Sequence, residues 1–479
     1  MSKKFMTFRP LALIGGAQAA TVFIAGCSLM PTYERPDAPV PAQWPASASV
    51  NANATATSTG ASATPLAWQD YFTDPALRQL IDAALANNRD LRVAMLNIEQ
   101  AKAQLGIRRA DQFPTLSAGI TGSRTPDSGG SIKSAYTGGL TVTAYELDFF
   151  GRVASLKEQA LGQYLATAEA AQTAQISLIA TVAQSWMALL ADEELLAVSR
   201  QTMASREESF KLVGLKQQHG AASDYELRGA QTLLESARVT LAQQTRQRAL
   251  DENALVLLLG QPLNETSRAQ LAQQSLNQLK LAELPAGLPS DLLIRRPDIR
   301  QAEHNLIASN ANIGAARAAF FPRISLTAGA GSASSELSGL FKNGSWGWTL
   351  APQLVLPIFD AGRNQANLDA SRVGRDIAVA NYEKSIQGAF REVADALASR
   401  ATLMQQLQAS QALLDAETSR SSLTQLRLDN GAANQLDWLD AKRSLFTAQQ
   451  GLVQTRLAYL QNQVALFKTL GGGASAPVR

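Results

Sequence analysis

The chain has 479 residues, with 43 basic and 40 acidic side chains, two histidines and one cysteine. Its first 26 residues carry three basic and no acidic side chains, so the remainder is close to neutral and lacks the basic surface that nucleic-acid binding requires. With so few imidazole and thiol groups, and no visible cluster of acid, base and nucleophile, the sequence predicts no metal, no cofactor and no enzyme activity.

The N-terminus has the pattern of a targeting segment. Basic residues precede an uncharged apolar run, Leu11–Ala25, which is too short for a membrane helix with such flanks and predicts a lipoprotein signal peptide over residues 1–26. The run ends at Ile24-Ala25-Gly26-Cys27, which resembles the lipobox of bacterial lipoproteins, so we predict lipidation of Cys27. Ser28 favours the outer membrane, by resemblance to enterobacterial lipoproteins. The alternative is a chance cysteine behind an ordinary signal peptide.

Three stretches lack the pattern of a packed core. Residues 27–66 are predicted to form an acylated extended segment and a linker, because they are rich in proline and then in Ala, Ser, Thr and Asn. Residues 262–290 are polar and interrupted by prolines, and we expect an equatorial segment between two larger parts of the chain. The glycine-led residues 471–479 are predicted to be a flexible tail.

The two larger parts, residues 67–261 and 291–470, repeat one another. Matching residues recur at an offset of 208 and, further along, of 211. The clearest pairs are Asp90-Leu91-Arg92 with Asp298-Ile299-Arg300, Phe113-Pro114 with Phe321-Pro322, Gly151-Arg152 with Gly362-Arg363, and Gly220-Ala221-Ala222 with Gly431-Ala432-Ala433. A duplication of this kind predicts two similar structural units in one chain.

Each repeat is predicted to be mostly helical. The stretches Arg152–His219 and Arg363–Asn430 contain no proline, and their apolar residues recur at spacings of three and four, as in a coiled coil. Each stretch would span roughly 100 Å if it were helical throughout. A shorter helix is expected to follow the glycine turn at Gly220 or Gly431 and to pack antiparallel on the long one.

Four segments alternate between apolar and small polar residues, at about residues 115–123, 138–148, 323–332 and 347–358. This alternation is typical of membrane-spanning strands. In the second segment, Leu140, Val142 and Ala144 are predicted to lie opposite Thr141, Thr143 and Tyr145. The polar faces carry Ser, Thr and Gly, which suit a water-filled lumen. A half-buried sheet of a soluble protein would alternate in the same way and is the alternative on this pattern alone.

Aromatic residues gather at both ends of the predicted strands. Membrane–water interfaces select aromatic side chains in two girdles, so this distribution favours a membrane barrel over a soluble sheet. The helix-facing group is Phe113, Phe149, Phe150, Phe320, Phe321 and Phe359. The loop-end group is Tyr136, Trp346 and Trp348.

Four strands cannot close a barrel, and an open edge facing lipid would leave backbone groups without partners. The barrel must therefore be shared between chains. Two chains would give eight strands and a filled interior, whereas three would give twelve and leave a pore, which the small polar face favours. The predicted fold is mainly α with a membrane β-barrel: a duplicated protomer whose trimer forms a 12-stranded β-barrel and a long α-helical barrel.

Several motifs are highly specific. They are Cys27-Ser28-Leu29, Tyr33-x-Arg35-Pro36, the run Gly287-Leu288-Pro289-Ser290 to Arg295-Arg296-Pro297-Asp298-Ile299, and Phe359-Asp360-x-Gly362-Arg363. Together they resemble the outer-membrane factor (TolC-like) family, in its OprM-like lipoprotein branch. The resemblance covers nearly the whole chain after residue 26. It implies a lipid-anchored homotrimer in the outer membrane that extends into the periplasm, with a periplasmic adaptor (membrane fusion protein) and an inner-membrane pump of the RND class as partners.

The resemblance also implies a gate at the periplasmic tip, where acidic residues surround a constriction. The matching residues are Leu436 as the apolar gate residue, and Asp437, Asp440 and Glu226 as the acidic ones. The alternative is that these acids only stabilise the starts of helices. The tyrosine and arginine clasp of the TolC type has no match, because Leu428 and Ala433 stand at those positions.

The sequence therefore predicts the outer-membrane channel of a tripartite multidrug efflux system, a passive exit duct with a gated periplasmic entrance. The same duct could serve protein or metal export. An alternative from another class is a lipid-anchored coiled-coil structural protein without a pore, although such a protein has no use for aromatic girdles.

Overall fold

The computed structural model of the chain describes residues 28–41, 44, 67–126, 128–284 and 296–472. The predicted signal peptide, the lipidation site Cys27 and most of the linker and of the C-terminal tail lie outside the described residues. The chain divides into two compact units. The sheet unit comprises Met1–Asp37, Ile98–Thr167 and Ala302–Tyr382, and the hairpin unit comprises Ala38–Asn97, Ala168–Gln301 and Glu383–Arg479.

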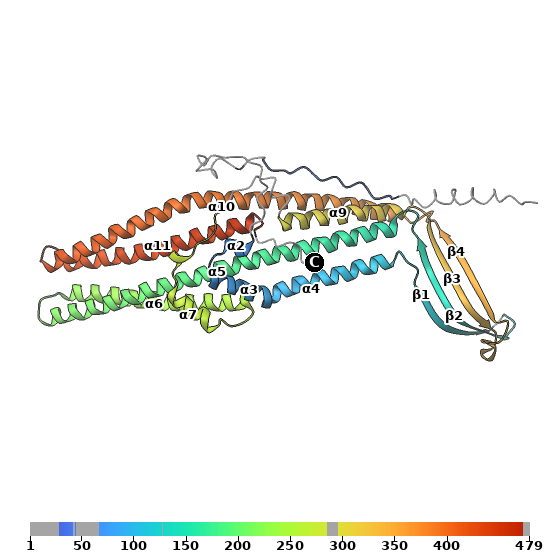
Figure 1. Cartoon of the computed structure of the whole chain (residues 1–479), viewed down its shortest axis with the longest axis horizontal. Helices are drawn as coiled ribbons and strands as arrows, with labels where there is room; N and C mark the ends of the chain where they lie inside the picture. Colours follow the sequence, from blue (N-terminus) through green and yellow to red (C-terminus); the bar gives the residue numbers. More distant parts are fainter. Residues whose placement is uncertain (1–27, 42–43, 45–66, 127, 285–295, 473–479) are drawn as a thin grey trace, which may run out of the picture. The chain divides into compact units, whose positions relative to one another are not determined.

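Helices make up most of the described chain, and four strands form one sheet (Figure 1). In chain order the elements are α2 (Trp68–Tyr71), α3 (Pro75–Asn87), α4 (Arg89–Ala110), β1 (Leu116–Pro126), β2 (Ile132–Leu147), α5 (Arg152–Gln218), α6 (Asp224–Leu259), α7 (Glu265–Gln273), η3 (Leu276–Gln278), α9 (Pro297–Ala318), β3 (Arg323–Ser334), η4 (Leu337–Gly339), β4 (Trp346–Val355), α10 (Arg363–Asp429) and α11 (Gln435–Thr469).

The two sequence repeats contain the same elements in the same order. Each has a 22-residue helix, α4 or α9, followed by two strands and a 67-residue helix, α5 or α10. A shorter helix then follows, of 36 residues in α6 and 35 in α11. The long helices begin where the proline-free stretches begin and end one residue before those stretches end.

Both hairpin turns use the same backbone chemistry. After α5, Gly220 has a φ of 70°, and the backbone N–H of Ala221 donates to the carbonyl of Lys216 at 2.7 Å. Gly431 and Ala432 repeat this arrangement after α10. A left-handed glycine after the last helical residue closes the helix in the Schellman pattern. The sequence therefore ends both long helices at equivalent places.

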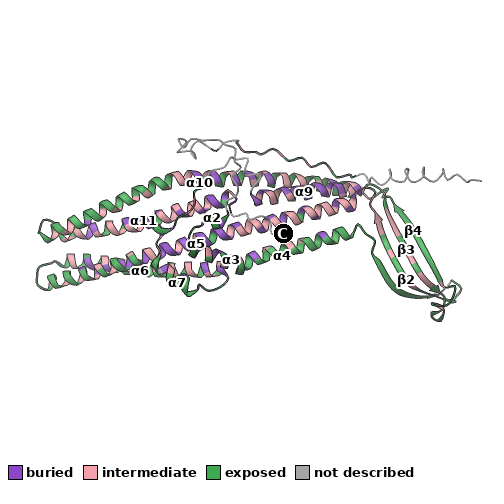
Figure 2. Ribbon diagram, viewed as in Figure 1, coloured by how far each residue is buried: buried purple, intermediate pink, exposed green. Residues whose placement is uncertain are grey.

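The core of the hairpin unit surrounds the middle of α5. Trp186, Met187 and Leu190 are fully buried there, among residues of α2, α3, α6 and α11, and Figure 2 shows this buried stretch of α5. The ring of Tyr71 stacks on that of Phe467 in the same core, with centroids 4.3 Å apart. By length and composition α5 could cross a membrane, but 61% of its most apolar 18-residue window is buried. We therefore interpret α5 as a core helix.

The sheet unit contains one antiparallel sheet in the order β1-β2-β3-β4. The strands of the first hairpin extend further toward the loop than predicted, because β1 ends at Pro126 and β2 begins at Ile132. Backbone pairing there does not depend on apolar alternation, and polar residues such as Arg124 and Ser134 continue the ladder. In the second hairpin, β4 ends at Val355 and not near residue 358.

The register of the strands confirms the predicted apolar faces of β1, β3 and β4. One row of facing residues crosses the sheet through Ala118, Leu140, Ala330 and Trp348. Residues that face one another across a ladder lie on the same side of a sheet. The apolar residues of all four strands therefore share one face along this part of the sheet.

The prediction for the second half of β2 is wrong. A β-bulge lies between Val142, which faces Ala328, and Tyr145, which faces Leu326, so that three steps on β2 match two on β3. Ala144 lies within the bulge and has a φ of 51°. Because one inserted residue exchanges the two faces of a strand, Tyr145 lies on the same face as Val142 and not opposite to it.

Candidate functional site: the sheet and the hairpin ends

The apolar face of the sheet is exposed to solvent in the single chain. β1 and β4 are exposed along their whole length, as Figure 2 shows. Large apolar side chains on this face are more than half exposed, among them Ile120 at 68%, Trp346 at 70% and Leu354 at 62%. A patch of this kind marks a surface that binds lipid or another protein. The outer strands β1 and β4 also each have one edge that pairs with no described strand.

The opposite face of the sheet carries small residues. One row crosses all four strands through Gly119, Gly139, Gly331 and Gly347. β2 and β3 approach each other closely in this row, and a Cβ on Gly139 would overlap the carbonyl oxygen of Ala330. No atom lies within 4 Å of a Cβ placed on Gly119. A face without side chains leaves its space to water, as a lumen requires.

The predicted interface aromatics lie at the strand ends. At the loop end, Trp346 and Trp348 belong to the apolar face of β4 and are 70% and 68% exposed. At the helix-facing end, the exposed residues are Phe113, Phe149, Phe320, Phe321 and Phe359. Phe150 differs, because it is only partly exposed and its ring stacks on Phe321 at a centroid distance of 4.8 Å. These two aromatic rings therefore contact each other within the chain, besides being available to a membrane interface.

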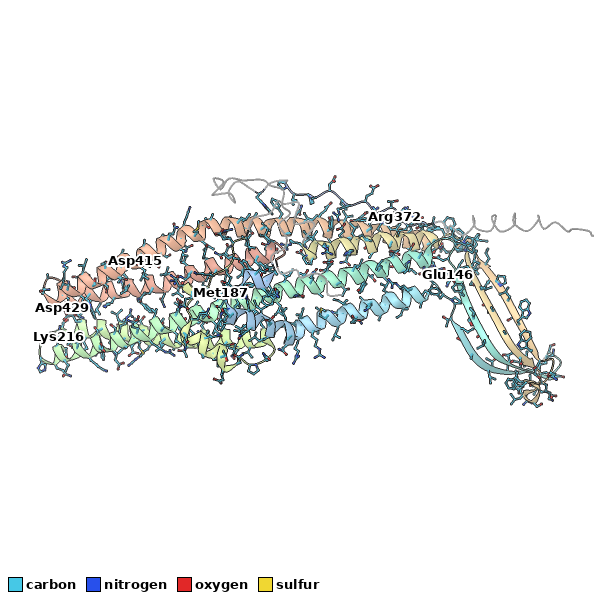
Figure 3. The ribbon with its side chains drawn as sticks, in the orientation of Figure 1. Glu146, Met187, Lys216, Arg372, Asp415 and Asp429 are labelled. Carbon is cyan, nitrogen blue, oxygen red and sulfur yellow. The ribbon has the colours of Figure 1, made fainter. Side chains whose placement is uncertain are left out.

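A group that the sequence reasoning missed lies at the helix-facing end of β2. The bulge turns Glu146 to the polar face, and its side chain is only 10% exposed. Its Oε2 lies 2.6 Å from Nη2 of Arg152 at the start of α5, and 2.7 Å from Nε of Arg323 in β3. Glu146, labelled in Figure 3, thus ties the two strands to the helix beside a cavity of about 560 Å³. The sequence feature that could have revealed this group is a single acidic residue in an otherwise uncharged part of the strand.

The N-terminal strap, which we define as Ser28–Asp37, is bound along α9. The guanidinium of Arg35 donates to both carboxylate oxygens of Glu303, at 2.7 and 2.9 Å. The hydroxyl of Tyr33 donates to the same carboxylate at 3.1 Å. Burial, and then the Glu303 carboxylate, raise the pKa of Tyr33, so that this hydroxyl keeps its proton. The Tyr33-x-Arg35 motif therefore fixes the strap to the second repeat.

The predicted gate residues lie at the ends of the two hairpins, near Lys216 and Asp429 in Figure 3. Leu436 is 63% exposed. The side chain of Asp437 accepts a hydrogen bond from the backbone N–H of Asn434. The side chain of Asn434 accepts one from the backbone N–H of Asp437, and the two bonds form a capping box. Glu226 forms the same box with Ser223 in the first repeat. Asp437 and Glu226 therefore stabilise the starts of α11 and α6 through these hydrogen bonds.

Hydrogen bonding also changes the acidity of Glu226. The backbone N–H of Ser223 donates to its carboxylate at 2.7 Å, and the hydroxyl of Ser223 donates at 2.9 Å. These two hydrogen bonds, the backbone bond first, hold the pKa of Glu226 below its ordinary value. The charge of this residue at the hairpin end is therefore maintained.

Asp440 has a different environment from Asp437. Its Oδ2 lies 3.2 Å from Nη2 of Arg420 in α10, and its Oδ1 is paired with Arg443, one turn further along α11. Arg420 also binds Glu417 at 3.1 Å. The charge of Asp440 is thus compensated by two arginines, and the carboxylate connects the two helices of the second hairpin.

A sequence profile of the outer membrane efflux proteins matches residues 80–261 and 288–472, one stretch in each repeat. The chain belongs to this family. It is 48% identical over 465 residues to the solvent efflux pump outer membrane protein SrpC of Pseudomonas putida, covering 95% of this chain and 97% of SrpC. It is 44% identical over 462 residues to the outer membrane protein OprJ of Pseudomonas aeruginosa, covering 94% of each chain.

Solved structures show the same fold. The open-state outer membrane channel MtrE of Neisseria gonorrhoeae has a TM-score of 0.84 and 40% identity, covering 94% of this chain and 99% of MtrE. A membrane protein from Pseudomonas aeruginosa has a TM-score of 0.85 and 44% identity, covering 93% and 98%. The predicted fold class of the TolC-like channels is confirmed, and so are the efflux function and the outer-membrane location. The coiled-coil alternative without a pore is wrong.

Proposed function

We propose that three copies of this chain close one 12-stranded barrel and form a passive exit duct, without bond chemistry or a cofactor. The exposed apolar face of the sheet carries this proposal. Lipid would cover such a face, and the free edges of β1 and β4 would then need neighbouring strands because a lipid environment offers no hydrogen bonds. Twelve strands leave a lumen, and the glycine row would face it.

The proposed partners are a periplasmic adaptor and an inner-membrane pump of the RND class, which would supply the energy. Relatives that are 48% identical are named as outer membrane proteins of solvent, toluene and antibiotic efflux pumps. We therefore propose small organic compounds, including antibiotics, as the exported class. Cys27 is proposed as the lipid attachment site, and the aromatic residues at the strand ends as the interface girdles.

We further propose that Leu436 and Asp437 form the narrow periplasmic entrance, with Glu226 as the corresponding acid of the first repeat. Threefold repetition would bring three copies of each residue around the axis, where carboxylates attract cations. Asp440 would contribute less to the charge of the entrance, because Arg420 and Arg443 neutralise it. Its ion pair with Arg420 would instead hold α10 and α11 of the second hairpin together.

Single-channel conductance in planar bilayers tests the duct. The purified protein is expected to run as a trimer and to give defined conductance steps, which should increase when Leu436, Asp437 and Asp440 are all replaced by alanine. Absence of both trimers and conductance in the wild type and in this variant would refute the duct. Equal conductance in the wild type and in this variant would contradict the proposed narrowing at the periplasmic entrance.

Ion selectivity tests the acids separately. The pair Asp437→Asn and Asp440→Asn should lower the preference for cations, measured as the reversal potential in a salt gradient, with most of the effect from Asp437→Asn. Asp415→Asn is the matched control, because Asp415 is an exposed acid on α10 that hydrogen-bonds Gln411. A reversal potential equal in all variants would contradict the proposed role.

A further inference from the structure

A small cavity of about 100 Å³ lies between α5, α6 and α11 in the hairpin unit. Its wall contains two cationic side chains, Arg206 of α5 and Lys442 of α11, and the aromatic rings of Trp438 and Phe446. Within the described part of the chain, no acidic side chain lines it. The cavity is therefore electropositive and contains no carboxylate of its own.

Arg206 is a buried charge in the wall of this cavity. It is only 8% exposed, its Nη1 donates to the carbonyl of Leu233 at 2.9 Å, and its guanidinium carbon lies 5.5 Å from the centre of the Phe446 ring. Among the described residues it forms no ion pair. Burial, and then the nearby Arg443, lower the pKa of Arg206. A guanidinium has five N–H donors, and a buried one is costly unless it is paired, so most of its binding capacity is unused.

Two neutral donors in the same wall are also unsatisfied. The indole Nε1 of Trp438 and the hydroxyl of Ser209 are buried, and no described residue forms a hydrogen bond with either. Buried donors without a partner are rare in folded proteins, and two of them in one small cavity indicate a missing acceptor. The ammonium of Lys442 lies 5.7 Å from the centre of the Trp438 ring and adds a second positive charge.

We propose that this cavity binds a single carboxylate group, with the guanidinium of Arg206 on its two oxygens and Trp438 and Ser209 as additional donors. A planar guanidinium matches the two oxygens of a carboxylate. The volume suits a group of the size of acetate. The carboxylate belongs either to a small organic acid or to an Asp or Glu side chain of a docked protein, and the recognition chemistry is the same for both.

Titration of the full-length protein in detergent with sodium acetate tests this site, with sodium chloride at equal ionic strength as reference. The unfolding temperature should rise in a saturable manner with acetate and not with chloride. Arg206→Gln should weaken acetate binding at least tenfold, since charge-assisted hydrogen bonds are the strong ones. Arg200→Gln removes an exposed arginine two turns earlier on α5 and should leave the affinity unchanged.

Trp438→Phe and Ser209→Ala keep Arg206 and remove one neutral donor each. Both should weaken acetate binding several-fold, and they decide the question if Arg206→Gln does not fold. Equal responses to acetate and chloride, or equal acetate affinity in the wild type and these variants, would overturn the proposal. A blocked Ala-Glu-Ala tripeptide, compared with Ala-Gln-Ala, distinguishes the two sources: binding of acetate alone assigns a small acid, and binding of the Glu peptide as well assigns a side chain.

Discussion

Replacement of Asp192 by asparagine should make the protein more stable at neutral and alkaline pH. Asp192 in α5 is 6% exposed, and its Oδ2 is buried and has no hydrogen-bond partner among the described residues. Burial, and then the carboxyl of Asp251 in α6, raise the pKa of Asp192 from 3.8 to about 7. Arg248, the cation that acts on Asp192, is bound to Glu193 and Glu252, at 2.6 Å each. Asp192 is therefore stable in this place only while it holds a proton.

The sign follows from the direction of this pKa. The folded protein binds the proton of Asp192 more tightly than the unfolded chain, so its stabilising effect is complete below about pH 4 and is lost as the pH rises to about 7. This difference in pKa corresponds to at most about 4 kcal/mol of unfolding free energy per chain. With an unfolding entropy of about 2.1 cal/mol/K per residue, a chain of this length would lose roughly 4 °C in unfolding temperature. The charged groups that act on Asp192 are Asp251, Glu193 and Arg248, and Arg248 is paired with Glu252, which also binds Arg268.

The assay is the unfolding temperature of the full-length protein between pH 5 and pH 8. The wild type should become less stable over this range, whereas Asp192→Asn should lack that part of the decline and be roughly 2 to 4 °C more stable at pH 8. Glu208→Gln, which changes an exposed acid of the same helix, is the control and should follow the wild type. If the unfolding temperatures of the wild type and of Asp192→Asn changed in parallel with pH, the raised pKa of Asp192 in the folded protein would be refuted.

Three further substitutions test the sheet unit. Gly139→Ala should destabilise the sheet by about 1–3 kcal/mol, because its methyl group would overlap the backbone of β3, whereas Gly119→Ala meets no atom within 4 Å; the temperature at which the oligomer dissociates on a gel should fall only for the first. Ala144→Gly should stabilise by about 1 kcal/mol, since a φ of 51° is strained for alanine, and an unchanged or lower unfolding temperature would speak against this strain. Glu146→Gln should cost about 1–3 kcal/mol, because Arg152 and Arg323 lose the only carboxylate with which either forms an ion pair among the described residues. The double variant Glu146→Gln with Arg152→Gln should recover part of this loss, measured as the unfolding temperature.

The strands and long helices could be predicted because both depend on short-range pattern. Alternation of apolar and polar residues, and long stretches without proline, are visible in the sequence itself. The bulge in β2 was not visible, because Thr143, Ala144 and Tyr145 continue the alternation of the strand. Only the partner strand reveals that one residue is inserted. The same event moved Glu146 to the polar face, so its two ion pairs were missed for the same reason.

The hairpin ends were predicted in part. The spacing Ser223-x-x-Glu226, and Asn434-x-x-Asp437 in the second repeat, contains the capping boxes, so their helix-start role was available as an alternative. The bond of Asp440 to Arg420 joins residues on two helices, and its strength depends on how those helices pack. The same limit applies to the cavity at Arg206, whose wall combines residues more than 200 positions apart in the sequence.

The N-terminal strap distinguishes the two repeats. Gly106 and Gly314 occupy equivalent positions, yet a Cβ on Gly314 would lie 2.9 Å from Cα of Met30, whereas no atom lies within 4 Å at Gly106. At this pair of positions the described strap therefore contacts the second repeat and not the first, and a trimer would carry three straps on six similar repeats. The carbonyl of Leu29 accepts a hydrogen bond from Arg317 at 3.2 Å, one residue before the end of α9. The chain leads from α9 through Phe320 and Phe321 into β3, so the described part of the strap is bound at the end of α9 that adjoins the sheet and the proposed girdle.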